Sequence, residues 1–298
     1  MAASPGSKAR GITAQNEPQN LELLAAASHY YNLAKLVAGF QSFITVPIAV
    51  ASYCLLIADP TLKVWTTFFA LTIALVDTII LERLQTRYRS LGATAQEYFD
   101  CAVLNIPWNE FLCRRKLEPA DLTAAALKFG DRSKLRDWYP PVVAKLDQGR
   151  AALISQLSAV RWDSVQRRKY ATCLAGFGLM VLFCLIVISI YRNYKMTDFI
   201  LALYTPLAPA IIWITRESLR QRDAAERLDS LRSIIDRTWT RVTDEGLTDP
   251  PIRRIQDALF DARGRNALVF NWVYRLQRSE QEQAMNRNAA AMVAALKA

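Results

Sequence analysis

Histidine is nearly missing from this 298-residue sequence, in which His29 is the single example. A metal cluster based on histidines, or a catalytic triad that contains one, therefore cannot be assembled within one chain. The P-loop, G-x-G-x-x-G and G-x-S-x-G motifs are missing as well. We therefore expect no catalytic residues, no bound metal and a protein that is not an enzyme.

The five cysteines form neither a metal-binding nor a disulfide pattern. Cys54, Cys173 and Cys184 fall within long apolar runs, while Cys101 and Cys113 lack C-x-x-C spacing. This usage is typical of a chain in a reducing compartment.

Charge is missing from three long apolar stretches and nearly missing from a fourth. Each stretch is close to the ~20 residues that a helix needs to cross a bilayer, and aromatic residues such as Trp65 and Tyr170 lie at their ends, as at membrane interfaces. The alternative is a set of very apolar core helices in a soluble protein. We predict four spans, near residues 37–57, 64–82, 171–191 and 199–215.

The distribution of basic residues predicts the orientation of these spans. The short loops 59–63 and 192–198 hold three Lys and Arg residues together, whereas residues 82–169 hold sixteen and residues 216–298 hold fifteen. By the positive-inside rule, the long segments and both termini are cytoplasmic, which places the protein in the cell inner membrane. Residues 1–22 lack the apolar core of a signal peptide, so we expect the first span to direct insertion.

We therefore expect an all-α, multi-pass membrane protein in which four transmembrane helices form two hairpins. Strand-like composition is scarce, and the ambiguous run Leu268–Tyr274 has a length and flanks that favour the final predicted helix, 266–296. The helical cytosolic domain would be built from the middle and C-terminal segments. The predicted division is an N-terminal tail and amphipathic lead-in helix (1–36), hairpin 1 (37–82), a cytosolic segment (83–170), hairpin 2 (171–215) and a C-terminal cytosolic segment (216–298).

The net charge of +10 has two interpretations. Arginines beside the spans can bind anionic lipid head groups, in which case the charge reflects membrane topology rather than a nucleic-acid polymer. A basic cytosolic surface would also suit a ligand that carries phosphates. Both remain open at this point.

Asp77 is the one ionisable residue inside a predicted span. An acidic group in the bilayer is costly, so it is a candidate for a pore or gating role. Its closeness to Glu82 and Arg83 also allows it to reach the interface or to pair there. Pro47, Pro206 and Pro209 permit kinks in the first and fourth spans, a common feature of membrane helices.

Several local strings, taken in order around the four spans, resemble the SMODS-associating four-transmembrane effector family of bacterial CBASS antiphage systems. The strings cover most of the chain. They include Gln96-Glu97-Tyr98-Phe99-Asp100, Pro107-Trp108-Asn109, Asp137-Trp138-Tyr139-Pro140, Arg161-Trp162-Asp163, Lys169-Tyr170, Ile255-Gln256-Asp257 with Phe260 and Arg263, and Val269, Trp272, Tyr274 and Arg278.

The resemblance implies a two-part system. A partner nucleotidyltransferase makes a cyclic di- or oligonucleotide during infection, and the effector binds it, oligomerises or opens its membrane helices, and permeabilises or depolarises the membrane. A constitutive or otherwise gated channel or transporter, and a membrane scaffold, are the alternatives.

A cyclic nucleotide requires cations for its phosphates and aromatic faces or amides for its bases. The cytosolic segments contain residues of these kinds, although the same aromatic residues also serve as packing in small helical domains. The candidate ligand-binding residues are Trp108, Asn109, Trp138, Tyr139, Arg161, Trp162 and Arg167.

Overall fold

The computed structural model describes residues 10–44, 51, 55, 59, 61, 63–113, 117–247 and 250–296. Every regular element within these residues is helical, which confirms the all-α prediction. The elements are α1 (Arg10–Thr13), η1 (Ala14–Asn16), α2 (Pro18–Phe43), α4 (Lys63–Val76), η4 (Asp77–Leu81), α5 (Glu82–Leu104), α6 (Pro119–Leu127), η5 (Arg132–Leu135), η6 (Pro141–Lys145), α7 (Gln148–Tyr191), α8 (Met196–Asp198), η7 (Phe199–Tyr204), α9 (Thr205–Asp244), α10 (Ile252–Arg265) and α11 (Asn271–Ala295).

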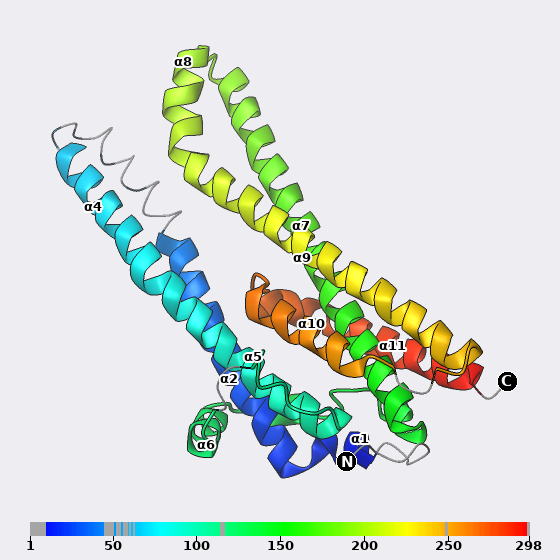
Figure 1. The fold of residues 1–298 in the computed structure, drawn as a ribbon. Coiled ribbons are helices and arrows are strands. Elements are labelled where there is room, and N and C mark those ends of the chain that lie inside the picture. Colours follow the sequence, from blue (N-terminus) through cyan, green and yellow to red (C-terminus); the bar gives the residue numbers. More distant parts are fainter. Residues whose placement is uncertain are drawn as a thin grey trace.

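Two pairs of long antiparallel helices dominate the structure (Figure 1). In the first pair, α2 packs along α5, which continues without interruption from α4 through the π-helix η4. In the second pair, α7 packs along α9. The two pairs diverge toward the same side of the molecule, and α10 and α11 lie between their other ends (Figure 1). We call the part of the structure formed by these ends, α10, α11 and the short elements around them the body.

Local chemistry sets several helix ends. The Asp147 carboxylate accepts a hydrogen bond from the backbone N–H of Arg150 at 3.0 Å and thereby caps the start of α7. Asn105 ends α5 in the left-handed conformation, with φ of 51°, a role that asparagine tolerates better than most residues. Pro119 occupies the first turn of α6, where its missing N–H costs no hydrogen bond.

A continuous helix, α2, covers the segment of the predicted lead-in helix and runs through Lys35 as far as Phe43. The predicted start of the final helix is wrong, since α11 begins at Asn271 and the backbone at Phe270 is extended. Residues 268–270 are therefore loop rather than helix. Their apolar side chains pack between helices, with Val269 buried against Tyr170, so tertiary contacts outweigh the helical preference.

The body contains two adjoining apolar cores. In the first, Leu24 of α2, Phe99 of α5 and Ile154 of α7 are fully buried together with Tyr139. The second joins α7, α9 and α10 through Leu153, Leu157, Leu228, Ile235, Ile255 and Leu259. Because α7 contributes to both cores, it ties the two halves of the body together.

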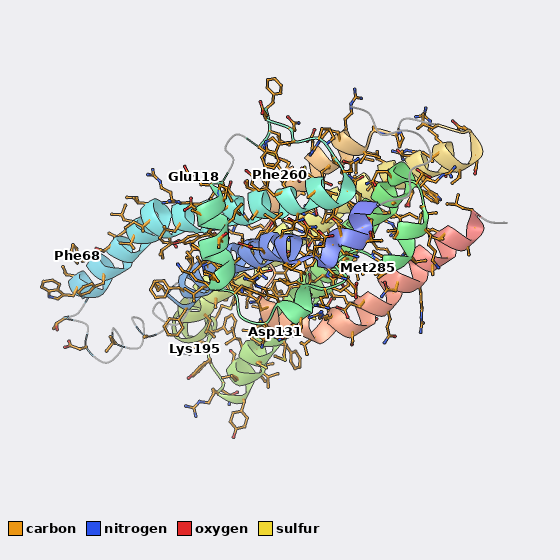
Figure 2. The ribbon with its side chains drawn as sticks, turned by 90° about the horizontal axis from the view of Figure 1, so that it is seen from below. Phe68, Glu118, Asp131, Lys195, Phe260 and Met285 are labelled. Carbon is orange, nitrogen blue, oxygen red and sulfur yellow. The ribbon has the colours of Figure 1, made fainter. Side chains whose placement is uncertain are left out.

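Outside the body, the same helices expose large apolar side chains. α7 is the one helix of the described residues that is long and apolar enough to cross a membrane on its own, and 6% of its apolar window is buried. Phe68 and Lys195 mark the outer parts of the two hairpins, away from Met285 in the body (Figure 2). The exposed residues include Phe40, Phe43, Trp65, Phe68, Phe69, Leu71, Leu75, Phe177, Leu179, Met180, Phe183, Ile186 and Ile190.

Asp77 lies at the start of η4, where the helix widens locally to the π form. Its carboxylate is partly buried and accepts a hydrogen bond of 2.9 Å from the Gln41 amide of α2. This contact gives Asp77 a structural partner within hairpin 1. Pro47 and Cys54, together with much of the first predicted span, lie outside the described residues.

Candidate ligand-binding site

A cavity of about 270 Å³ opens in the body between the two helix pairs. Six helices and two loops contribute to its wall, so it depends on the packing of distant segments. Its lining residues are Tyr31, Lys35, Gln96, Lys134, Arg136, Asp137, Trp138, Tyr139, Ser158, Ala159, Trp162, Asp163, Gln166, Arg167, Leu228, Leu259, Ala262, Arg263, Asn266, Leu268, Val269, Tyr274, Arg278, Glu282 and Met285.

The cavity combines positive charge with aromatic surface. Six Lys and Arg side chains line it against three Asp and Glu side chains. The aromatic residues come from four places: Tyr31 on α2, Trp138 and Tyr139 in the loop after η5, Trp162 on α7 and Tyr274 on α11. Cations of this kind bind phosphate oxygens, and aromatic faces stack on bases, so the lining suits an anionic ligand that contains a ring system.

Arg167 is the most constrained cation of the lining. It is 7% exposed, and its Nε lies 2.9 Å from an Asp163 carboxylate oxygen. Its Nη1 donates to the side-chain oxygen of Gln221 at 2.8 Å and to the backbone oxygen of Ala267 at 2.5 Å. The guanidinium is therefore held in one position at the cavity wall by three different elements.

Lys35 lies where α2 enters the first predicted span, and its Nζ donates to the Asn271 side-chain oxygen at 2.7 Å. Burial, together with repulsion from Arg167, lowers the pKa of Lys35 to about 8. A bound anion would favour the charged ammonium form. Lys35 can thus link anion binding to proton uptake near neutral pH.

Besides the Arg167 Nε, which is ion-paired with Asp163, two hydrogen-bond donors in the lining have no hydrogen-bond partner among the described residues. These are the Tyr31 hydroxyl and the Asn266 side-chain amide nitrogen, both buried from solvent. Because an unpaired buried donor costs about 1–3 kcal/mol, it usually has a partner such as water or a ligand. Both donors are available to a molecule in the cavity.

Behind the cavity wall, a buried ionic network joins α5 to α10. Asp100 is fully buried and forms a salt bridge with Arg263, whose pKa is raised because the carboxylate outweighs the effect of burial. Asp100 also accepts hydrogen bonds from the Tyr139 hydroxyl and the Gln256 amide, at 2.7 Å and 2.8 Å. Arg263 and Tyr139 belong to this network and to the cavity lining at the same time.

Glu97 extends the network by one helical turn. It is also fully buried, and its two carboxylate oxygens accept from Arg253 at 2.7 Å and from Gln256 at 2.8 Å. Burial and the neighbouring Asp100 raise the pKa of Glu97. Two acids of one helix are thus held by three side chains of α10, which fixes α10 on α5.

The structure brings together four of the seven residues that the sequence analysis grouped. Trp138, Tyr139, Trp162 and Arg167 all line the cavity. The remaining three, Trp108, Asn109 and Arg161, lie outside its lining.

The first two of these three residues have structural partners. Trp108 stacks on Tyr98 with 4.5 Å between ring centroids. The Asn109 amide donates to Asp257 of α10 at 3.0 Å, which connects the loop after α5 to α10. These contacts indicate that Trp108 and Asn109 have a packing role, which the sequence analysis gave as the alternative to ligand binding.

The sequence grouping missed several residues of the lining, notably Lys35, Arg263, Tyr274 and Arg278. Arg263, Tyr274 and Arg278 belong to the strings that carry the resemblance to the family. The sequence therefore pointed to these residues without indicating that they share a site. Lys35 also belongs to a string of the resemblance, Ala34-Lys35. Within the described part of the chain, no cluster of three or more His, Cys, Asp or Glu side chains is placed to hold a metal ion.

Comparison with known proteins identifies a family that the sequence matches. Residues 12–292 match the SMODS-associating 4TM effector domain. A protein from Bacillus cereus (strain VD146), described as a probable CBASS effector molecule, is 27% identical over 280 residues, which cover 91% of this chain and 94% of that protein. No solved structure matches the chain.

The family and the exposed apolar helix α7 indicate membrane association. A CBASS effector also implies a partner system that produces a cyclic nucleotide. Since the family match spans nearly the whole sequence, the chain belongs to the SMODS-associating 4TM effector domain family and has the role of an antiphage effector.

Proposed function

We propose that the protein senses a cyclic di- or oligonucleotide in the body cavity and responds by oligomerising or opening its membrane helices. The response would permeabilise or depolarise the inner membrane and arrest the infected cell without any catalytic step. The observation that carries the proposal is the position of the cavity. The helices that form its walls continue directly into helical segments with exposed apolar side chains.

The lining supports a nucleotide as the ligand. Lys35 and Arg167 are placed to bind phosphate oxygens, while Trp138, Trp162 and Tyr274 offer faces for bases. The unpaired donors of Tyr31 and Asn266 add hydrogen-bonding capacity for base edges or sugar hydroxyls. An uncharged ligand would not compensate the excess positive charge of the lining, whereas a phosphate would.

The small volume of the cavity suggests that nucleotide binding moves the helices that form its walls. About 270 Å³ lies near the lower end of the ~300–1,000 Å³ range of ligand pockets. A cyclic di- or oligonucleotide contains at least two nucleotide units, so it can enter fully only if the walls separate. α2 and α7 would then carry that separation toward the membrane.

The membrane part of the proposal is four spans with both termini in the cytoplasm. The exposed apolar side chains lie almost entirely within or beside the four predicted segments, a distribution that water disfavours and lipid favours. α4 and η4 together cover residues 63–81, roughly 28 Å of helix, which is close to the bilayer core. α7 continues through the predicted third span to Tyr191.

Calorimetry with the purified full chain and a panel of cyclic di- and trinucleotides tests the sensing step. Trp162→Ala should weaken binding by about five- to 150-fold, since loss of a base-stacking face costs about 1–3 kcal/mol. Trp108→Ala is the matched control, because each tryptophan contacts one tyrosine but only Trp162 lines the cavity. The control should bind like the unmodified protein.

Dye leakage from vesicles tests the output. Nucleotide should raise leakage in the unmodified protein and in Trp108→Ala, with a higher threshold in Trp162→Ala. Binding to no member of the panel, together with leakage that never depends on nucleotide, contradicts the proposal. Steady ion-selective currents without ligand would favour a constitutive channel instead.

A further inference from the structure

The segment that joins α10 to α11 comprises the loop 266–270 and Asn271, the first residue of α11. All four long helices that lead to the predicted spans contact it. Three consecutive backbone oxygens each accept a side-chain hydrogen bond from a different helix. Asn266 accepts from Arg89 of α5 at 3.3 Å, Ala267 from Arg167 of α7 at 2.5 Å, and Leu268 from Gln221 of α9 at 3.1 Å.

The fourth helix, α2, is held through Asn271. The side-chain oxygen of Asn271 accepts from Lys35 at 2.7 Å, and its amide donates to Asn32 at 2.8 Å. The loop thus bridges hairpin 1, through α2 and α5, to hairpin 2, through α7 and α9. Deeper in the body the two pairs are also joined, through the first apolar core and through α10, which packs on α5, α7 and α9. The bridge is a further connection between the pairs, and it is made by polar side chains.

The bridge lies at the base of the hairpins. Lys35, Arg89, Arg167 and Gln221 are each within about two helical turns of a predicted span. Apolar contacts continue in the same direction, since Phe270 and Leu174 of α7 both pack against the cluster of Tyr170, Val269 and Val273. On the other side, a Cβ at Gly39 of α2 would lie 3.8 Å from the Phe270 ring.

The bridge also shares residues with the cavity. Lys35 and Arg167 donate to the loop and line the cavity, and Asn266, Leu268 and Val269 are loop residues that form part of its wall. A phosphate placed in the cavity would compete with the loop carbonyl and amide oxygens for both cations. Since a charged acceptor binds a cation more strongly than a neutral one, the competition favours the phosphate.

We propose that residues 266–271 act as a clasp that holds the two hairpins together at their base in the ligand-free protein, and that a phosphate-bearing ligand in the cavity releases it by recruiting Lys35 and Arg167. The release step rests on the proposed function, whereas the holding step does not. Clasp opening would free the hairpins to separate or rotate, and the apolar faces that they expose could then pack against other copies in the membrane.

Distance measurement in vesicles of phosphatidylethanolamine and phosphatidylglycerol tests the holding step without ligand. Spin labels on unnatural amino acids at the exposed positions Thr86 of α5 and Arg222 of α9 report the separation of the hairpin bases while native cysteines remain in place. The loosened variant combines Gln221→Met with Asn271→Ala, two residues outside the cavity lining. Its separated population should rise about tenfold for each hydrogen bond lost, with a matching rise in ligand-free leakage.

A second substitution at residue 271 should strengthen the contact with Lys35 instead of removing it. Asn271→Asp places a carboxylate against the Lys35 ammonium, which should raise the temperature at which the separated population appears and should lower ligand-free leakage. Gln283→Ala, at an exposed position on α11, is the control and should behave like the unmodified protein.

An unchanged separated population in the loosened variant, together with an unaltered separation temperature in Asn271→Asp, overturns the clasp whether or not a nucleotide binds. Should the loosened variant fail to fold, an unaltered separation temperature in Asn271→Asp overturns it by itself. Shifted distances in a protein that binds no cyclic nucleotide sustain the holding step and contradict the sensing function, so the two failures are distinguishable. Release is supported when a bound nucleotide lengthens the distance in the unmodified protein, and is contradicted when binding leaves it unchanged.

Discussion

The hairpins and the body reverse the usual relation between polarity and exposure. On α7, Phe183 is 66% exposed in the outer hairpin, whereas Glu97 and Asp100 of α5 are fully buried in the body. Large apolar groups avoid water, and buried charges require partners. The difference fits the proposed placement of the outer helices in lipid, while ion pairs and hydrogen bonds compensate the charges that are buried in the body.

Removal of one charge from the body network should give the largest effect. Asp100→Asn leaves Arg263 buried without its carboxylate, and breaking such a pair costs about 3–5 kcal/mol of unfolding free energy. Chemical denaturation of the full chain in detergent measures this loss. Asp229→Asn, which removes the partner of the exposed Arg168, is the control and should cost less than about 1 kcal/mol. Equal losses in both variants would mean that burial does not distinguish the two pairs.

Insertion of a charge into the exposed apolar face should give the next largest effect. Phe183→Arg, near the centre of the third predicted span, should oppose membrane insertion by about 2.5–3.5 kcal/mol. Phe111→Arg is the control, since Phe111 is 96% exposed but lies in a loop of the body. The fraction of each variant that stays in membranes after an alkaline wash gives the comparison. If both variants insert normally, the outer helices are not in lipid.

Glycine substitutions compare packing in the two regions. A Cβ at Gly11 would lie 2.1 Å from the Val103 carbonyl oxygen, so Gly11→Ala should destabilise the body by about 1–3 kcal/mol. No neighbour among the described residues lies within 4 Å of a Cβ at Gly176, which is in the third predicted span. Gly176→Ala should therefore be neutral, or stabilising by up to about 1 kcal/mol. Thermal unfolding measures both, and a destabilised Gly176→Ala would reveal a packed hairpin.

The smallest expected effect concerns Lys35, which lies at the boundary between the two regions. Because its pKa is about 8, its ammonium group loses its proton as the pH rises from about 7 to about 9, while nucleotide phosphates stay ionised. Affinity for an anionic nucleotide should fall by about tenfold over that interval. Lys35→Arg keeps its charge and should remove the dependence. A flat profile in the unmodified protein would exclude Lys35 from phosphate binding.

Part of the site could be predicted from sequence, and part could not. Trp138, Tyr139, Trp162 and Arg167 share residue types that suit a nucleotide, and the fold brings all four to one cavity. Trp108 has the same chemistry but stacks on Tyr98 instead. Residue type indicates what a side chain can bind, whereas the packing of α5, α7 and α10 determines which side chains face the cavity.

The sequence by itself determined that the chain is helical and apolar in long stretches, because periodicity and charge-free runs are local properties of consecutive residues. It also predicted a helix that leads into the first predicted span, where the structure has α2. Only the tertiary structure decided that residues 268–270 form a loop and that Glu97 and Asp100 are buried partners of α10. The partners of Glu97 and Asp100 lie more than 150 residues away in the sequence, and no local sequence pattern reports the energy of such contacts.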